Sequence, residues 1–314
     1  MAERCGEPLP ARARVLWRRR AGLGAALLLA AALLAGAAAA KGRCVEDDTG
    51  REVCLEGPAQ RIVALSPGVT ELLFAAGAGE RVVAAVSHAD YPEPARELPR
   101  VGSYERLDLE SLLAFRPDLV VAWQGGNSPH QLERLEEAGA TLYRSAQGRL
   151  ERIPATLERL GRLAGTEAAA REAAAAFRER LAGLRRRYAG RDPVTVFYEI
   201  WDAPLMTVNG EQMISDAIRI CGGRNIFAEL DRLAPRVDKE AVLAADPEAI
   251  VAGGMGGEGG HSLLAPWRRY ESLRAARRGN LFFVDPALLQ RPTPRVLEGT
   301  ARLCEHLEQA RQRR

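Results

Sequence analysis

Side chains suited to ligand contact gather in six short segments, each of which follows an apolar run. Tyr91, Tyr104, Trp123 and Trp201 lie in or beside these segments, among glycines and amides and without a convergent acid, base and nucleophile. The segments are 66–68, 87–91, 123–127, 200–204, 253–261 and 285–291. Aromatic faces with a few polar groups suit a large, partly flat ligand held without a covalent bond. The pattern predicts a binding site and no catalytic residue.

Two motifs that would indicate an enzyme are incomplete. The glycine run 254–259 formally matches Gly-x-Gly-x-x-Gly, but it does not open a domain and glycine is abundant around it. We expect this run to form a loop over the ligand. Ser66 precedes a proline and lacks the Gly-x-Ser-x-Gly frame of a serine hydrolase. An oxidoreductase that uses a metal or a nucleotide stays the alternative from another class.

The histidines are scattered along the chain. His88, His130, His261 and His306 have no partner at the i, i+4 spacing and no adjacent carboxylate signature. We expect no metal site in this protein. A chelating pair that spans the chain, such as His88 with His261, stays open.

The cysteines indicate an oxidising compartment. Of five cysteines, Cys5 lies in the N-terminal leader and four remain in the rest of the chain. Cys44 and Cys54 flank the turn signal Asp-Asp-Thr-Gly, so a disulfide across a hairpin is reasonable, and Cys221 and Cys304 would then pair. Zinc is the competing interpretation, but the sequence lacks a Cys-x-x-Cys spacing.

The first 40 residues differ in composition from the rest. A basic stretch at 12–20 precedes the apolar run 21–40, which ends in small residues, and this order is typical of a cleavable signal peptide. An uncleaved membrane anchor is the alternative, since 20 apolar residues can span a bilayer. Without this segment the chain has 38 basic and 39 acidic residues, a net charge near −1, which does not support nucleic-acid binding.

Apolar strand patterns alternate with helical patterns on both sides of one long helix. The stretch 166–190 carries apolar residues at three- and four-residue steps, with Thr166 as N-cap, arginines at 185–187 and Gly190 beyond its end. The alternation predicts an α/β protein of two lobes, each with a parallel-type sheet flanked by helices, joined by that helix. We expect a signal peptide at 1–40, a first lobe at 41–149, an amphipathic helix and the interlobe helix at 150–190, and a second lobe at 191–314.

Three stretches carry a family resemblance. These stretches resemble the extracytoplasmic cobalamin-binding proteins of bacterial vitamin importers. They are residues 61–92, the pair 101–104 and 107–127, and Ile-Cys-Gly-Gly-Arg-Asn-Ile-Phe at 220–227. The resemblance covers about 61–304 and extends to the wider class of haem and siderophore binders. It implies a rigid two-lobe fold, a ligand between the lobes, and delivery to the permease dimer of an ATP-binding-cassette transporter.

The resemblance also implies roles for single residues. Glu110 and Glu211 match the two acids that pair with permease arginines. The sequence departs from the family pattern at Tyr104, Ile200 and Leu288, where other aromatic residues are usual. The positions that match ligand contacts are Pro67, Tyr91, Tyr104, Trp123, Gly125, Gly126, Ile200 and Arg291.

Together these patterns predict a monomeric, periplasmic solute-binding protein. Its ligand is expected to be a corrinoid, cobalamin, carried as cargo and not as a cofactor. A haem or ferric-siderophore carrier is the alternative within the binding class.

Overall fold

The computed structural model describes residues 42–146, 148–254 and 261–314. The predicted signal peptide at 1–40 and most of the glycine run 254–259 lie outside these ranges. Residues 42–314 form one compact unit, in which the described strands include two four-stranded parallel sheets. None of the helices in the described ranges has the length and apolar content that a membrane span requires.

The first sheet has the strand order β4-β3-β5-β6. Its strands are β3 (Ile62–Ala64), β4 (Val82–Ala85), β5 (Leu119–Gln124) and β6 (Leu142–Ala146). Helices α2 (Pro67–Ala75), α3 (Leu109–Ala114), α4 (Pro129–Glu137) and α5 (Ile153–Ala164) accompany it. Successive residues of the strands enter different apolar clusters, as strand geometry requires: Val121 belongs to one and Val120 to the other. The sheet is therefore buried on both faces, as expected of a parallel sheet.

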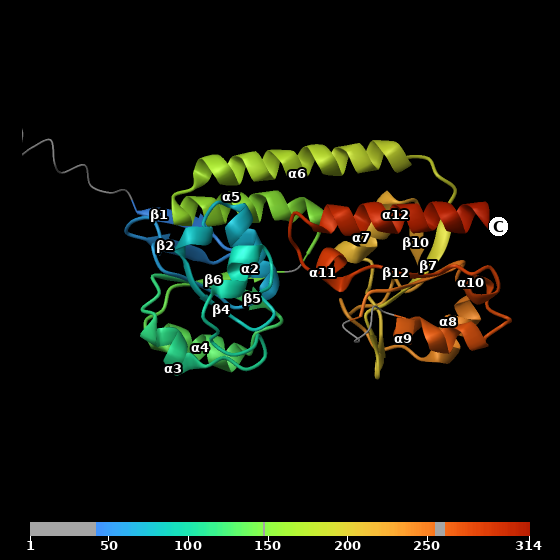
Figure 1. Ribbon diagram of the computed structural model, residues 1–314, viewed down its shortest axis with the longest axis horizontal. Coiled ribbons are helices and arrows are strands. Elements are labelled where there is room, and N and C mark those ends of the chain that lie inside the picture. The colour runs from blue at the N-terminus through green and yellow to red at the C-terminus, as the bar shows by residue number, and fades with distance from the viewer. Residues whose placement is uncertain (1–41, 147, 255–260) are drawn as a thin grey trace, which may run out of the picture. The chain divides into compact units, whose positions relative to one another are not determined.

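The second sheet has the order β10-β7-β11-β12. Its strands are β7 (Val194–Glu199), β10 (Gly223–Asn225), β11 (Ala249–Ala252) and β12 (Leu281–Phe283). Its helices are α7 (Met213–Ile220), α8 (Lys239–Ala245), α9 (His261–Leu264), α10 (Arg274–Arg277), α11 (Pro286–Leu289) and α12 (Val296–Gln312). A small hairpin, β8 (Trp201–Asp202) with β9 (Leu205–Met206), follows β7. The two predicted parallel sheets with flanking helices are confirmed (Figure 1).

Helix α6 (Glu167–Tyr188) is the long helix that the sequence predicts. Its buried side chains Ala170, Phe177, Leu181 and Tyr188 belong to one apolar cluster that also contains residues of both sheets. The prediction for Thr166 is wrong in one respect. This residue holds the N-cap position, but its hydroxyl donates to Ala76 O at 2.6 Å and does not accept a bond from the helix.

The N-terminal hairpin packs on the first lobe. Strands β1 (Arg43–Glu46) and β2 (Glu52–Leu55) pair antiparallel, and the disulfide between Cys44 and Cys54 joins directly opposed positions. In the turn, the Asp48 carboxylate accepts hydrogen bonds from Thr156 Oγ1 at 3.0 Å and from Arg159 Nη1 at 2.7 Å. Both partners lie on α5, so the hairpin is fixed to the helix that precedes α6.

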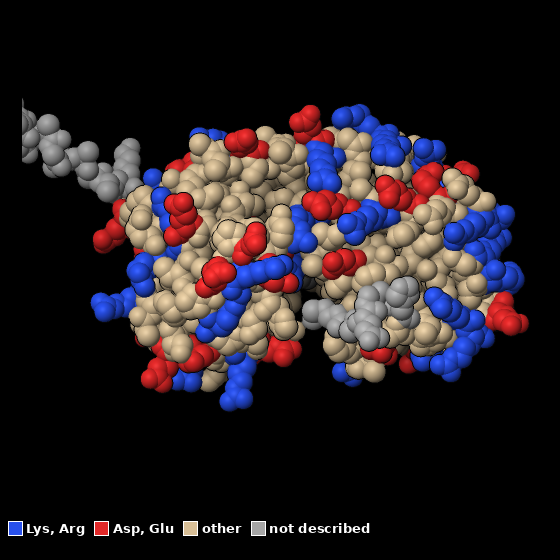
Figure 2. All heavy atoms as spheres, viewed as in Figure 1, with Lys and Arg blue, Asp and Glu red and all other residues tan. Residues whose placement is uncertain are grey.

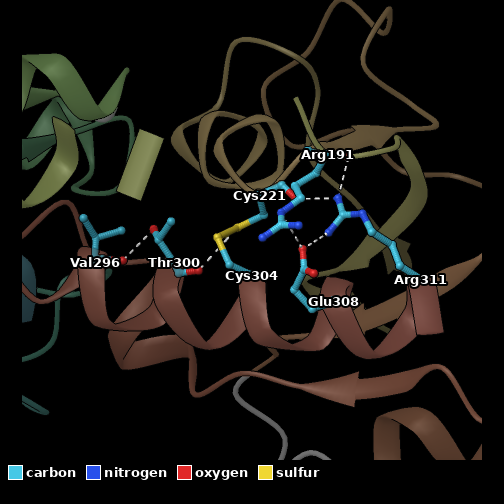
Figure 3. Close-up of a disulfide and its surroundings, with 8 residues drawn as sticks. Arg191, Cys221, Val296, Thr300, Cys304, Glu308 and Arg311 are labelled. Carbon is cyan, nitrogen blue, oxygen red and sulfur yellow. Dashed lines mark hydrogen bonds and ion pairs between the residues drawn. A yellow bond between two sulfur atoms is a disulfide. The ribbon is translucent and has the colours of Figure 1, made fainter. Parts of the chain in front are cut away.

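The second disulfide, Cys221–Cys304, joins the end of α7 to the middle of α12 (Figure 3). Both cysteines are fully buried. Beside them, Arg311 Nη2 donates to Cys221 O at 2.7 Å, and Glu308 lies between Arg311 and Arg191. The guanidinium thus satisfies a carbonyl at the end of α7 that has no partner within the helix.

The two disulfides are expected to contribute unequally to stability. The bonds close loops with sequence separations of 83 and 10 residues. Loop-closure entropy corresponds to about 4–5 kcal/mol for the longer loop and about 3 kcal/mol for the shorter one. We therefore expect Cys221→Ser/Cys304→Ser to lower the free energy of unfolding more than Cys44→Ser/Cys54→Ser, as measured by urea titration. Equal losses would contradict this ranking.

Candidate functional site

Trp123 and Tyr104 form an aromatic pair at the carboxyl end of the first sheet. Their ring centroids are 5.4 Å apart and their planes are tilted by 57°. Asn127 holds the pair in place, since its Oδ1 accepts from Trp123 N at 2.7 Å and its Nδ2 donates to Tyr104 O at 2.8 Å. Both rings are partly exposed. They provide a fixed aromatic surface, and the sequence motif had not assigned a role to Asn127.

The glycines after Trp123 are required by this packing. Gly125 has φ +87°, a left-handed conformation that side chains rarely adopt. A Cβ atom at Gly126 would overlap the Trp123 ring. The Gly-Gly pair thus allows the backbone to turn closely beneath the indole. Any contact of these glycines with a ligand stays a prediction.

Pro67 opens helix α2, and its neighbour contacts the second lobe. The Ser66 hydroxyl caps the helix by accepting from Val69 N at 3.1 Å. A Cβ atom at Gly68 would lie 3.4 Å from Pro292 Cδ and 3.6 Å from Arg291 Cβ. The start of α2 therefore meets the segment that leads into α12.

Arg291 is engaged in an ion-pair cluster within the protein. Its Nη1 lies 2.8 Å from Glu71 Oε1 and 3.1 Å from Asp90 Oδ1. Glu71 is 3% exposed and also accepts from Thr293 Oγ1 at 3.1 Å, with Arg295 at 3.5 Å. Burial raises the pKa of Glu71, and the two arginines counteract part of that rise. This cluster joins α2 to the start of α12, so a ligand contact by Arg291 stays a prediction.

Sequence reasoning had missed Glu71 as a member of this cluster. The available signal was the single charged residue of the helix 67–75, together with two arginines in the segment 291–295. Tyr91 belongs to the same surface. The Arg295 guanidinium lies 3.8 Å from the centroid of the Tyr91 ring, which is 45% exposed. The cation–π contact orients that ring while leaving much of it accessible.

Trp201 is an exposed aromatic residue of the second lobe, and it follows the carboxyl end of β7. Ile200 donates its N–H to Met206 O at 3.0 Å, which fixes the β8–β9 hairpin. Trp201 is 42% exposed, and its Nε1 donates to Ala203 O at 2.9 Å. Leu288 is 4% exposed. The Leu288 side chain is therefore buried in the second lobe and presents little surface to solvent.

Glu199, the last residue of β7, is a buried acid that sequence reasoning had also missed. It is 1% exposed, and its Oε2 accepts from Trp267 Nε1 at 2.6 Å. Burial raises the pKa of Glu199 to about 7, the Trp267 bond lowers it in part, and Asp202 and Lys239 act in opposite directions. Glu199 lies two residues before the exposed Trp201.

Glu110 and Glu211 are both exposed. Glu110 lies in the first turn of α3, whose N-cap Asp108 accepts from Ser111 N at 3.1 Å. Glu211 lies two residues before α7, and its N–H donates to Asn209 Oδ1 at 3.0 Å. Both carboxylates are held on ordered turns, one in each lobe.

Among the described residues, three further features bear on other kinds of site: a cavity, a group of possible metal ligands and the distribution of surface charge. A cavity of about 390 Å³ lies away from these loops and is lined by residues at the ends of α6 and α7, including Tyr188, Asp216 and Arg219. The metal-ligand group found among the described side chains consists of Glu52 with the disulfide-bonded Cys44 and Cys54. Basic and acidic side chains intermingle on the face drawn in Figure 2. That face carries no continuous basic surface of the kind that binds nucleic acid.

Comparison with known proteins identifies the family. The model of the periplasmic binding protein family matches residues 62–288. The chain belongs to the periplasmic binding protein family. Over 260 residues it is 36% identical to the vitamin B12-binding protein of Vibrio campbellii, covering 82% of this chain and 93% of that protein.

Solved structures agree with this membership. The periplasmic vitamin B12-binding protein BtuF of Vibrio cholerae matches with a TM-score of 0.75 and 34% identity, over 81% of this chain and 98% of that one. A periplasmic haem-binding protein from Pseudomonas aeruginosa matches with a TM-score of 0.70 and 26% identity, over 78% and 91% of the two chains. Members of this family bind solutes for transport. This periplasmic binding protein is accordingly a binding protein and not an enzyme.

The buried Glu199 is expected to make stability depend on pH. Because its pKa in the folded protein is about 7, above the usual 4.5, the folded state binds more protons between these values. The contribution of Glu199 to the free energy of unfolding is greatest below pH 4.5. It falls as the pH rises to about 7 and is constant above that pH. The loss is on the order of 3 kcal/mol, from a rise of the Glu199 pKa from 4.5 to about 7.

Glu199→Gln tests this assignment by urea unfolding at several pH values from 5 to 8. The variant should show a much smaller loss of unfolding free energy over this range, since the amide does not ionise. Glu110→Gln removes an exposed carboxylate and serves as the control with the wild-type slope. A variant of Glu199 that kept the full wild-type slope would refute the assignment.

Proposed function

We propose that this periplasmic binding protein captures a corrinoid, cobalamin, between its two lobes and delivers it to an ATP-binding-cassette importer. The observation that carries the proposal is the Tyr104–Trp123 pair, held by Asn127 at the carboxyl ends of the strands. Ligands of open parallel sheets bind at that edge. The similarity to vitamin B12-binding proteins along most of the chain supports cobalamin as the ligand.

The chemistry of the exposed loops fits a corrinoid. Tyr104 and Trp123 in the first lobe and Trp201 in the second offer ring faces to an extended macrocycle. Tyr91 adds a further ring whose orientation is fixed by Arg295. Aromatic side chains with two side-chain torsions lose little entropy on binding, so such a surface binds a large rigid ligand efficiently. Pro67, Gly125, Gly126, Ile200 and Arg291 complete the proposed contact surface.

Cobalamin binding is tested by calorimetric titration of the purified protein with cyanocobalamin, with haem and a ferric siderophore as competing ligands. We expect cyanocobalamin to bind most tightly. Trp123→Leu and Trp201→Leu should each weaken it about tenfold, because each removes a ring contact. Leu230→Ser changes an exposed apolar residue outside the proposed contact surface and should bind as the wild type does. Tight binding of haem alone would assign the protein to the alternative carrier class.

Delivery requires contact with the importer. We infer that Glu110 and Glu211 pair with arginines of the two permease subunits, one glutamate on each lobe. Both side chains are exposed and sit on short, hydrogen-bonded turns, which favours a defined contact. The protein would act as a monomer in the periplasm after removal of the segment 1–40 as a signal peptide. The two disulfide bonds support an oxidising location, because such bonds persist in oxidising compartments.

The docking role predicts a separation between binding and transport. Glu110→Arg/Glu211→Arg should retain the wild-type affinity for cyanocobalamin and should lose uptake into vesicles that contain the cognate importer. The matched control reverses two exposed glutamates of α6, Glu172→Arg/Glu179→Arg, and should support normal uptake. Unchanged uptake by the first double variant would exclude docking through these two residues.

A further inference from the structure

A cavity of about 390 Å³ lies where the end of α6 meets the segment before α5 and the end of α7. We call it the α6–α7 cavity, after the two helices, which pack together beneath the second half of α6 (Figure 1). None of its lining residues belongs to the loops proposed to hold the corrinoid. Four arginines and two acids give its lining a net formal charge of +2; they are Arg149, Arg185, Arg191, Arg219, Glu151 and Asp216.

The two acids engage only part of these guanidinium groups. Asp216 Oδ1 accepts from Arg149 Nη1 at 2.7 Å and also from Arg219 Nη2. Glu151 pairs with Arg185. Each guanidinium group has five N–H donors, so most donors of Arg149 and Arg185 have no partner among the described residues. The cavity therefore offers positive charge and hydrogen-bond donors in excess of its own acids.

Tyr188 supplies a second, independent feature of the same cavity. It lies in the last turn of α6, lines the cavity and is only 4% exposed. Within the described ranges its hydroxyl has no hydrogen-bond partner, and the oxygen is not sealed from solvent. A tyrosine hydroxyl in a buried residue usually has a partner. This hydroxyl is therefore available to a polar group bound beside the arginines.

We propose that the α6–α7 cavity is a second binding site, for a phosphate group. A phosphate carries a charge of about −2 near pH 7 and presents several acceptor oxygens, so it neutralises the excess charge and can meet more than one arginine. The planar guanidinium fork matches phosphate geometry. A volume of 390 Å³ lies within the usual range of ligand sites, about 300–1,000 Å³. The inference goes beyond the proposed function, since it assigns a ligand to a different part of the molecule.

The arginines of the cavity come from three parts of the fold. Arg149 precedes α5, Arg185 is in the last turn of α6, and Arg219 is on α7 of the second lobe. A phosphate held by all three would join the helical connection between the lobes to the second lobe itself. Because such a ligand binds the folded state and not the unfolded chain, phosphate is expected to raise the unfolding temperature.

The test is calorimetric titration of the purified protein with inorganic phosphate, in the absence of corrinoid. We expect saturable binding. Arg185→Gln/Arg219→Gln should weaken it at least about tenfold, because charge-assisted hydrogen bonds to phosphate are lost. The matched control, Arg171→Gln/Arg186→Gln, removes two exposed arginines of α6 that do not line the cavity, and it should bind phosphate as the wild type does.

Tyr188→Phe separates binding from folding. The change removes only a hydroxyl that has no partner in the described part of the chain, so the unfolding temperature without phosphate should equal that of the wild type. The rise in unfolding temperature on adding phosphate should be smaller than in the wild type, and the phosphate affinity should fall about threefold or more. A full wild-type response in Tyr188→Phe together with a wild-type affinity in Arg185→Gln/Arg219→Gln would overturn the inference.

A second titration, with glycerol 3-phosphate, distinguishes two sources of the group. Tighter binding of the ester would identify a phosphate monoester as the ligand, and tighter binding of inorganic phosphate would identify the free anion; both support a phosphate site. The absence of saturable binding by either would refute the site. Cyanocobalamin affinity should be unchanged in every variant, so the two proposals fail separately. Loss of cyanocobalamin binding in Arg185→Gln/Arg219→Gln would show a structural role for these arginines and overturn the inference.

Discussion

The buried carboxylate of Glu71 is the interaction on which the joining of the two lobes depends. It projects from α2 of the first lobe, and its partners Arg291, Thr293 and Arg295 all come from the segment that enters α12 of the second. A buried charge is tolerated only while its partners remain, and loss of one partner costs about 3–5 kcal/mol. Opening the lobes at this edge would break these contacts, so the cluster joins α2 of the first lobe to the start of α12.

Two further features make the same connection. Asp216 on α7 accepts two hydrogen bonds, from Arg149 Nη1 at 2.7 Å and from Leu150 N at 3.2 Å. Both donors precede α5. The apolar cluster that includes Phe177 and Leu181 of α6 also runs without interruption into both sheets. A single helix with a continuous core beneath it resists bending more than flexible linkers do. This construction would favour the proposed docking, in which Glu110 and Glu211 keep a constant separation.

Local sequence patterns predicted most helices and strands, but they did not predict hydrogen-bond and ion-pair partners that lie far apart in the sequence. Apolar periodicity predicted α6 and the alternation of strands and helices on both sides of it. Thr166 was misread because its hydroxyl partner, Ala76, lies 90 residues away. Arg291 matched a ligand-contact motif, yet its nearest partner is Glu71, 220 residues earlier. Pairings of this kind are set by tertiary packing, which no local pattern records.

The Cys221–Cys304 bond has a topological consequence. It closes the chain from the end of α7 to the middle of α12 into a covalent ring, which contains Arg291, Thr293 and Arg295. A single proteolytic cut anywhere inside that ring opens it but leaves both fragments attached through sulfur. The partners of Glu71 therefore stay tethered to the second lobe after such a cut.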